Sequence, residues 1–338
     1  MVIRMHLNET PFPPSPVVAE YLEKYSRVLN RYSWEELSNE LLEELSQYVG
    51  VDRGCLSVYP SSSEALRTIL RYVKKQGYKF LMLVPGFHAI YEFANIEGVQ
   101  VEELSLDLPG FTLPIERLLS VADRRTTVYL SNPNNPTSNL LVRDREVIEE
   151  LCQRAALVVV DEAYFEFSGV TFAELVESRC SNLVIIRTFS KAFALAGARV
   201  GYLASSKELV RGIDKHRPYY DVPIPSMAAA LGALQDLDYM KKIVDEVKKL
   251  REELRREVEK LGLRVLPSET NFLFIELPVK GEIVAKELKK RGILTKYFRR
   301  PEIERFLRVS VALREENKAF LENLRDVLEM IRSRGTAL

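Results

Sequence analysis

One lysine and one aspartate stand in this sequence where their chemistry could act on a carbonyl compound. Lys191 follows the apolar stretch Leu183–Ile186, which reads as part of a buried strand over Leu183–Thr188, and small or apolar residues surround it. Such a lysine loses hydration, so its pKa falls and its amine becomes a usable nucleophile. Asp161 ends a second apolar run, Leu157–Asp161. Both strands should open on the same edge of a parallel sheet, where ligands bind in α/β folds.

An acid and a lysine that converge at such an edge suggest a pyridoxal phosphate site. Lys191 would hold the cofactor as a Schiff base, and Asp161 would face the pyridinium nitrogen. Either residue alone is more often solvated surface than catalytic. The interpretation therefore depends on agreement from other segments of the chain.

Three segments of the chain agree with a pyridoxal phosphate site, and they follow one another in the order found in a known enzyme family. They are Asn132–Thr137, Asp161–Tyr164, and Thr188–Lys191 followed by Arg199. With these motifs the chain resembles the fold-type-I aminotransferases, and within them most closely the histidinol-phosphate aminotransferase branch. The resemblance runs from Leu7 to the final helix. It implies a pyridoxal 5'-phosphate cofactor and small-molecule substrates, namely an amino-acid-like phosphate and the glutamate/2-oxoglutarate pair.

The implied fold class is α/β. A large domain with a mostly parallel central sheet between helices is joined to a smaller α+β C-terminal domain. We expect residues 1–30 to form an N-terminal arm, which belongs to the small domain or lies over the site. Residues 31–240 would then form the large cofactor-binding domain and residues 241–338 the small domain.

The cofactor phosphate needs N–H groups at a helix start and a cation. The run Tyr59–Glu64 directly precedes a helix pattern, and Ser61 with Glu64 fits a capping box. The run departs from the Gly-Asn-Gly-type turn that is usual in the family. The residues expected to hold the phosphate are Ser62, Ser63, Thr188, Ser190 and Arg199.

The resemblance also assigns the residues that hold and tune the cofactor ring. Phe87 matches the aromatic residue that stacks on the ring face. Asn135 and Tyr164 would hydrogen-bond its phenolic oxygen, and Asp161 would keep its nitrogen protonated. Lys191, once freed by the substrate, would serve as the general base. The catalytic residues are accordingly Lys191, Asp161 and Tyr164.

Four residues are expected to contact substrate. Arg308 is a lone cation in an apolar strand, and the family uses the matching arginine to bind a carboxylate. Asn8 matches the family's opening motif, and Asn271 is expected to lie near the substrate. Lys296 stands where relatives often carry an arginine suited to the substrate phosphate, and Arg299 and Arg300, which follow it, are possible substitutes for that arginine. A lysine can pair with phosphate, but only as a point charge.

Tyr32 matches a tyrosine that reaches the cofactor phosphate of the neighbouring subunit. If this carries over, each site is completed by two chains and the protein is a homodimer. A tyrosine packed within its own chain is the alternative. The helix that follows should pack its leucines, Leu37, Leu41, Leu42 and Leu45, against the large domain.

Composition and net charge narrow the classes of partner and the location that the protein could have. The chain has 338 residues, is 46% hydrophobic and carries a formal net charge of 0, so no global charge favours nucleic acid or an anionic membrane. Its three cysteines, which lie far apart, favour free thiols over a disulfide framework or a metal site. We expect a cytoplasmic protein, because no signal-peptide pattern or membrane-spanning run is visible.

The elements that position these residues follow from periodicity. Helices are expected over Ser62–Lys75 and Asp144–Ala155, and a long helical pattern over Ser226–Lys260 should break near Leu237. The Pro-rich segment Thr10–Pro16 cannot form a helix or an inner strand. The remaining strands and helices are expected at Phe80–Val84, Val128–Ser131, Val200–Ala204, Asn271–Glu276, Glu282–Arg291, Gly292–Phe298, Phe306–Val311 and Glu315–Arg332.

Three alternatives to histidinol-phosphate transamination stay open at this point. Decarboxylation of threonine phosphate and transamination of aromatic amino acids would use the same scaffold and cofactor. A cofactor-binding sensor without turnover belongs to another class, and it usually carries a DNA-binding domain. No basic helix-turn-helix stretch is visible in this sequence.

Overall fold

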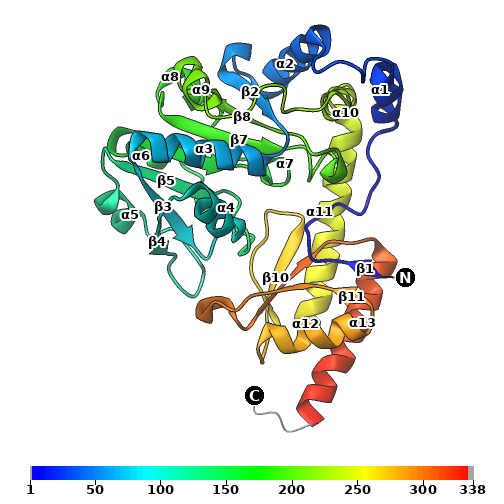
Figure 1. Ribbon diagram of the computed structural model, residues 1–338. Helices are drawn as coiled ribbons and strands as arrows, with labels where there is room; N and C mark the ends of the chain where they lie inside the picture. The colour runs from blue at the N-terminus through cyan, green and yellow to red at the C-terminus, as the bar shows by residue number, and fades with distance from the viewer. Residues whose placement is uncertain (1, 334–338) are drawn as a thin grey trace.

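The apolar runs form a central seven-stranded sheet in the computed structural model, which describes residues 2–333 (Figure 1). Five neighbouring strands run parallel, whereas β8 is antiparallel to both β7 and β2. The expected mostly parallel sheet is thereby confirmed. In spatial order the strands are β2 (Leu56–Tyr59), β8 (Gly201–Ser205), β7 (Leu183–Thr188), β6 (Leu157–Asp161), β5 (Thr126–Ser131), β3 (Lys79–Val84) and β4 (Val101–Ser105).

Helices cover both faces of this sheet because its strands are apolar on both sides. Val158 and Val160 of β6 pack into one buried cluster, and Leu157 and Val159 into another. The second cluster is closed by α3 (Ser62–Gln76), α4 (Ala89–Glu97) and α9 (Lys207–Asp214). The first is closed by α2 (Glu35–Val49), α5 (Ile115–Val121), α6 (Arg145–Arg154), α7 (Phe165–Ser168), α8 (Leu175–Ser178) and α10 (Ile224–Leu234).

Helix α3 begins where its sequence predicts. The Ser61 Oγ accepts a hydrogen bond from the Glu64 N–H at 3.2 Å, and Gly77 ends the helix at a φ of 69°. The Glu64 carboxylate pairs with Arg67 and Arg71 instead of closing the capping box. Ser61 is therefore an N-cap, and the two serines after it lie in the first turn.

The long helical pattern divides in two, as expected. Helix α10 ends at Leu234, and α11 (Leu237–Lys260) begins after Asp236, whose Oδ1 accepts from the Tyr239 N–H at 3.3 Å. Ser15 of the N-terminal segment donates to the other oxygen of Asp236 at 2.5 Å. Helix α11 then leads down into a second, smaller lobe (Figure 1).

The smaller lobe has its own apolar core beneath α11. Its antiparallel sheet has the order β12 (Lys296–Tyr297), β13 (Phe306–Ser310), β10 (Phe272–Glu276) and β9 (Arg264–Val265). Helices α12 (Gly281–Lys290) and α13 (Arg314–Ser333) cover it. The single strand expected over Gly292–Phe298 is wrong. Its first part, β11 (Ile293–Leu294), pairs with β1 (Ile3–Arg4), and only β12 joins β13.

The N-terminal segment joins the two lobes. It leaves β1 in the smaller lobe, contains no helix or strand over Thr10–Ser15, and enters α1 (Pro16–Ser26), which packs on α10 (Figure 1). Gly232 of α10 permits this contact, because a Cβ there would lie 3.0 Å from the Val17 carbonyl oxygen. The domain boundaries at residues 30 and 240 stay predictions. No helix among residues 2–333 is both long and apolar enough to cross a membrane.

Candidate active site

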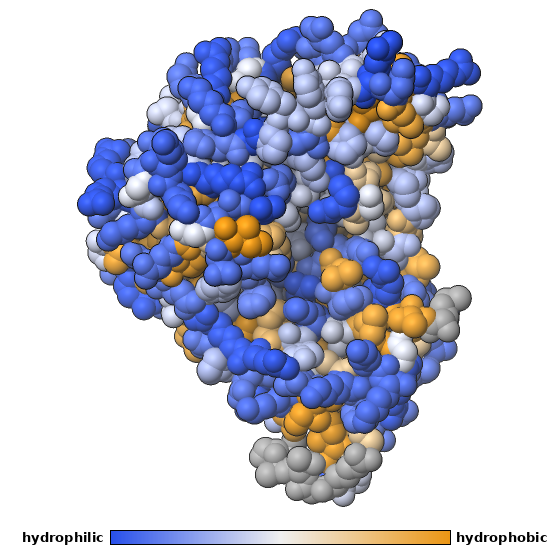
Figure 2. Space-filling view, in the orientation of Figure 1, coloured by the Kyte–Doolittle hydropathy of each residue, from blue (hydrophilic) through white to orange (hydrophobic). Residues whose placement is uncertain are grey.

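A cavity of about 490 Å³ lies between the carboxyl ends of the parallel strands, the N-terminal segment and the smaller lobe. The surface is hollowed between the two parts of the molecule in Figure 2. Thirteen of the residues predicted from the sequence line this cavity. They are Asn8, Ser62, Ser63, Phe87, Asn135, Asp161, Tyr164, Thr188, Ser190, Lys191, Arg199, Lys296 and Arg308. Asn271 and Tyr32 are not among its lining residues.

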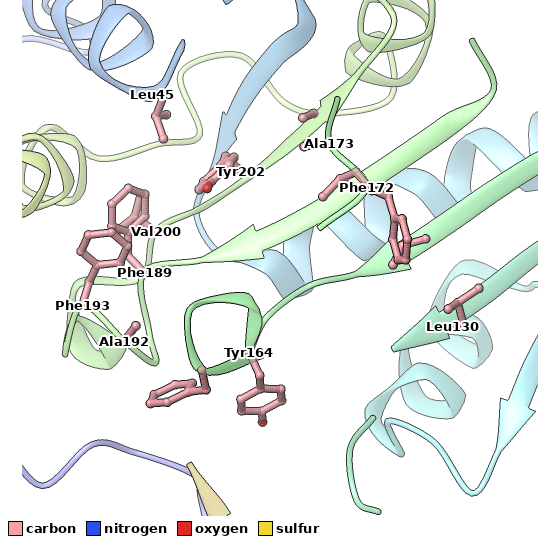
Figure 3. Close-up of a cluster of buried hydrophobic side chains, with 14 of the residues drawn as sticks. Leu45, Leu130, Tyr164, Phe172, Ala173, Phe189, Ala192, Phe193, Val200 and Tyr202 are labelled. Atoms are coloured by element: carbon pink, nitrogen blue, oxygen red, sulfur yellow. The ribbon is translucent and has the colours of Figure 1, made fainter. Parts of the chain in front are cut away.

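Lys191 lies in a loop that buried aromatic side chains hold against β8. Phe189 and Phe193 pack together, and Phe189 contacts Tyr202, as Figure 3 shows. The Lys191 Nζ donates to the carbonyl oxygens of Leu7 and Asn8, both at 3.1 Å. Burial and the nearby Arg308 guanidinium lower the pKa of Lys191 to about 8. A substantial fraction of its amine is therefore neutral near pH 8.

Asp161 ends β6 with its carboxylate buried at the cavity. Its Oδ2 accepts from the Tyr129 hydroxyl at 2.9 Å and its Oδ1 from the Ala163 N–H at 3.1 Å. Burial raises the pKa of Asp161 to about 6, opposed by the bonds from Tyr129 and Ala163 and by the charge of Lys191. The carboxylate is thus ionised at neutral pH and can face a cationic partner.

One end of the cavity has the donors that a phosphate needs. Ser62 and Ser63 lie in the first turn of α3, where backbone N–H groups and the helix dipole favour an anion. Thr188 and Ser190 come from the end of β7 and the loop after it. Arg199 is exposed, with a positive φ of 52°. Its guanidinium donates to the Ala196 carbonyl oxygen and lines the cavity.

Arg308 is buried in β13 without a carboxylate beside it. Its Nη1 donates to the Asn135 Oδ1 and its Nη2 to the His6 carbonyl oxygen, both at 2.6 Å. Its Nε is buried and has no hydrogen-bond partner. Burial lowers the pKa of Arg308 to about 10. A buried guanidinium with an unused donor at a cavity is suited to a carboxylate ligand.

Asn8 and Asn271 are both buried beside the cavity. Asn8 is 1% exposed at a positive φ of 56°, and its Nδ2 donates to the Tyr164 hydroxyl at 2.9 Å. Its backbone carbonyl accepts from the Asn271 Nδ2 at 2.9 Å. Asn271 therefore acts on the cavity through Asn8, whereas Asn8 lines the cavity and also orients the Tyr164 phenol.

Phe87 and Lys296 also line the cavity. Burial and the charge of Arg308 lower the pKa of Lys296. Arg299 and Arg300, which the sequence offered as substitutes for a phosphate-binding arginine, are engaged elsewhere. Arg299 pairs with Glu282 at 3.2 Å, and Arg300 pairs with Glu103 of β4 at 2.6 Å across the two lobes.

Tyr32 lies on a separate part of the surface. It is 86% exposed and stacks on Tyr220 with ring centroids 5.9 Å apart. A hollow of about 520 Å³ adjoins it, lined in part by Tyr219, which is 94% exposed. The following helix buries Leu37, Leu41 and Leu45, as expected. Tyr32 itself does not pack into the interior of its own chain.

Sequence reasoning missed two residues that shape the cavity. Tyr129 holds Asp161, and its place in a β5 strand expected to be buried was the only available signal. Gly201 begins β8, and a Cβ there would lie 2.5 Å from the Ser62 backbone nitrogen and 2.9 Å from the Arg187 carbonyl oxygen. Only a glycine allows the α3 start to approach β7 this closely.

The chain is similar to known proteins over nearly its whole length. The family model described as aminotransferase class I and II matches residues 1–324, and the chain belongs to this family. It is 35% identical to a histidinol-phosphate aminotransferase of Thermococcus gammatolerans, over 96% of this chain and 92% of that protein. It is 33% identical to that of Sulfurisphaera tokodaii, over 97% of this chain and 90% of the relative.

A solved structure agrees with the fold. The histidinol-phosphate aminotransferase from Sinorhizobium meliloti, in complex with pyridoxal-5'-phosphate, superposes with a TM-score of 0.89 at 25% identity. The match covers 98% of this chain and 92% of that one. The residues that line this cavity also fit pyridoxal phosphate. A lysine of lowered pKa, a buried carboxylate and the start of α3 line one cavity, as a ring with an aldehyde, a basic nitrogen and a phosphate requires.

Proposed function

We propose that this protein is a pyridoxal phosphate-dependent aminotransferase that exchanges an amino group between histidinol phosphate and the glutamate/2-oxoglutarate pair. The observation that carries the proposal is the convergence of Lys191, Asp161 and the buried Arg308 guanidinium on one cavity. The two relatives named above, both histidinol-phosphate aminotransferases, support this choice of substrate. The reaction of such an enzyme is a step in histidine biosynthesis.

The cofactor, when bound, supplies an aldehyde that links to an amine and a ring that withdraws electrons from the substrate Cα. The Lys191 Nζ would hold it and then carry the proton to and from that Cα. The Asp161 carboxylate would hold a proton on the ring nitrogen, and the Tyr129 hydroxyl orients this carboxylate. Asn135 and Tyr164 line the same cavity beside Asn8 and Arg308, and would bind the phenolic oxygen.

The two substrates place different demands on the cavity. Glutamate carries a carboxylate at its Cα, which suits the buried Arg308. Histidinol phosphate has no carboxylate but carries a distal phosphate. Lys296, which lines the cavity, is the cation proposed to meet it. Lys296 and Arg308 are register partners on β12 and β13, so the two cations would lie side by side in the site.

We further infer that the protein acts as a homodimer. The exposed ring of Tyr32, stacked on Tyr220 beside a hollow of about 520 Å³, would lie at the two-fold interface. The Tyr32 hydroxyl would then reach the partner's cofactor phosphate. Location in the cytoplasm stays a prediction from composition.

The function is tested by comparing three reactions on one preparation loaded with pyridoxal phosphate. We expect histidinol phosphate with 2-oxoglutarate to yield glutamate. Phenylalanine or tyrosine with 2-oxoglutarate should react far more slowly. Threonine phosphate alone should release no carbon dioxide. Carbon dioxide from threonine phosphate, without glutamate from the first mixture, would replace the proposal with a decarboxylase.

Two variants test how the substrates bind. Lys296→Met should raise the KM for histidinol phosphate and leave the KM for 2-oxoglutarate nearly unchanged. Arg308→Met should raise the KM for 2-oxoglutarate more than that for histidinol phosphate. The matched control is Arg299→Met, whose side chain is 76% exposed and lies outside the cavity lining. Equal effects of both variants on both substrates would show that the binding roles of Lys296 and Arg308 have been misassigned.

A further inference from the structure

A buried cluster of charged side chains lies against the active-site residues but has no part in the proposed chemistry. Glu162 and Arg187 form an ion pair at 3.0 Å, with exposed fractions of 0% and 2%. The Glu162 Oε2 also accepts from the Thr171 hydroxyl at 2.8 Å, and its Oε1 accepts from the Phe172 N–H at 2.8 Å. The Arg187 Nη2 donates to the Thr171 Oγ1 at 2.6 Å. The hydroxyl of Thr171 thus bridges the pair.

The members of this cluster are chain neighbours of site residues. Glu162 follows Asp161, and Arg187 precedes Thr188. The Arg187 guanidinium also lies 3.8 Å from the ring centroid of Phe165, the residue after Tyr164. Because neighbouring residues of an extended chain point in opposite directions, Arg187 lies behind the cavity that Thr188 lines.

A stability role alone does not account for this arrangement. A buried ion pair recovers its desolvation cost only with good geometry and added hydrogen bonds, and apolar residues of similar size often serve as well. This pair joins the ends of two adjacent strands, β6 and β7, and the loop that carries Thr171. Those strand ends carry the carboxylate and the hydroxyl that face the cofactor site.

We propose that Glu162 and Arg187, bridged by Thr171, are positioning residues that fix Asp161, Tyr164 and Thr188 relative to one another for cofactor binding. The inference rests on the proposed function, because it concerns how the cofactor site is held. None of the three side chains lines the cavity. Each acts through the backbone of its neighbour.

A second carboxylic acid, Glu166, adjoins the pair and sets the net charge of the whole cluster. The Glu166 Oε1 accepts from the Tyr48 hydroxyl of α2 at 3.1 Å, whereas its Oε2 is buried without a partner. Burial raises the pKa of Glu166 to about 7, although the positive charge of Arg187 opposes this. Tyr202 also faces Arg187. An ionised Glu166 would give the cluster of Glu162, Arg187 and Glu166 a net charge of −1, and its protonation leaves the cluster neutral.

The test measures cofactor binding to the apo-protein and the pH titration of the bound cofactor's visible absorbance. Glu162→Gln and Arg187→Met should each raise the pyridoxal phosphate dissociation constant about tenfold or more and shift the titration midpoint, because a small misplacement of the site is costly. The double variant should bind pyridoxal phosphate no more weakly than either single variant, since both substitutions disrupt the same ion pair. Thr171→Val, which removes only the bridging hydroxyl, should fold and change both quantities in the same direction.

The control is Glu97→Gln, which removes a carboxylate paired with Arg67 and Arg71 outside the cavity lining. It should lower the melting temperature without changing cofactor affinity. If Thr171→Val and the paired variants lower only the melting temperature while affinity and midpoint stay as in the wild type, the positioning role is overturned and the proposed function stands. A wild-type protein that binds no pyridoxal phosphate overturns both.

Discussion

Lys191 owes its reactivity to its surroundings. Its pKa is lowered to about 8 first by burial and next by the charge of Arg308. Only the neutral amine can attack an aldehyde, so the protonated form below this pKa is inert. We predict that the rate at which apo-protein captures pyridoxal phosphate rises with pH through a midpoint near 8 and levels off above about pH 9. Rapid-mixing absorbance measurements across this range would show the midpoint.

Removing the neighbouring cation should move that midpoint in a known direction. Arg308 lowers the pKa of Lys191, so Arg308→Met should raise it and shift the capture profile to higher pH. Arg300→Met is the control, because Arg300 pairs with Glu103 and lies outside the cavity lining. A profile that stays in place in Arg308→Met would contradict this account of the lowered pKa.

Asp161 contributes an ionised carboxylate that an amide cannot replace. Asp161→Asn should keep the cofactor, because the α3 start, Thr188 and Ser190 are untouched, yet it cannot hold a proton on the ring nitrogen. We expect a loss of roughly 4 kcal/mol in transition-state stabilisation, about a thousandfold in rate. Turnover with histidinol phosphate and 2-oxoglutarate measures it. A near-normal rate with bound cofactor would remove Asp161 from this role.

At the scale of elements, Gly201 controls how closely α3 approaches β7. A Cβ at this position would meet the Ser62 nitrogen and the Arg187 carbonyl oxygen, both of them backbone atoms that cannot move aside cheaply. Gly201→Ala should therefore cost about 1–3 kcal/mol of stability and weaken pyridoxal phosphate binding. Gly197→Ala is the matched control, because a Cβ there meets nothing within 4 Å. Melting temperature and cofactor titration of both variants provide the comparison, and equal behaviour would contradict the close-approach argument.

Comparison of the predicted with the observed elements shows which features the sequence alone could predict. Strands β6 and β7 have the predicted bounds because each begins with four apolar residues in a row, followed by Asp161 in β6 and by Arg187 and Thr188 in β7. Their parallel pairing puts Asp161 and Lys191 at one edge, as periodicity and strand order imply. The contact between Asn8 and Tyr164 spans 156 positions, and no local pattern encodes it. Similarly, the split of Gly292–Phe298 depends on pairing with β1, nearly the whole chain away.

At the scale of the whole molecule, the cavity depends on three parts of the chain. The sheet supplies Asp161 and Lys191, the smaller lobe supplies Arg308, and the N-terminal segment closes the space between them. Arg300 and Glu103 tie the lobes together on one side. The cavity holds thirteen predicted residues, whereas Tyr32 lies outside it on an exposed surface. A role for Tyr32 in cofactor binding therefore requires a second copy of the chain.

Mixing two impaired variants tests this requirement. Tyr32→Ala should bind cofactor weakly, and Lys191→Ala cannot hold it covalently. In a hybrid dimer, one site would contain both substitutions, while the other would combine an intact Lys191 with an intact Tyr32 from its partner. We therefore predict that subunit exchange between the variants restores activity, up to about half the wild-type value per hybrid, because one of two sites is complete. The assay is turnover after exchange, with mass measurements to confirm that hybrids have formed. Each variant taken alone through the same exchange is the control. If verified hybrids show no recovery, the site is built within one chain, and the exposed Tyr32 ring has another role.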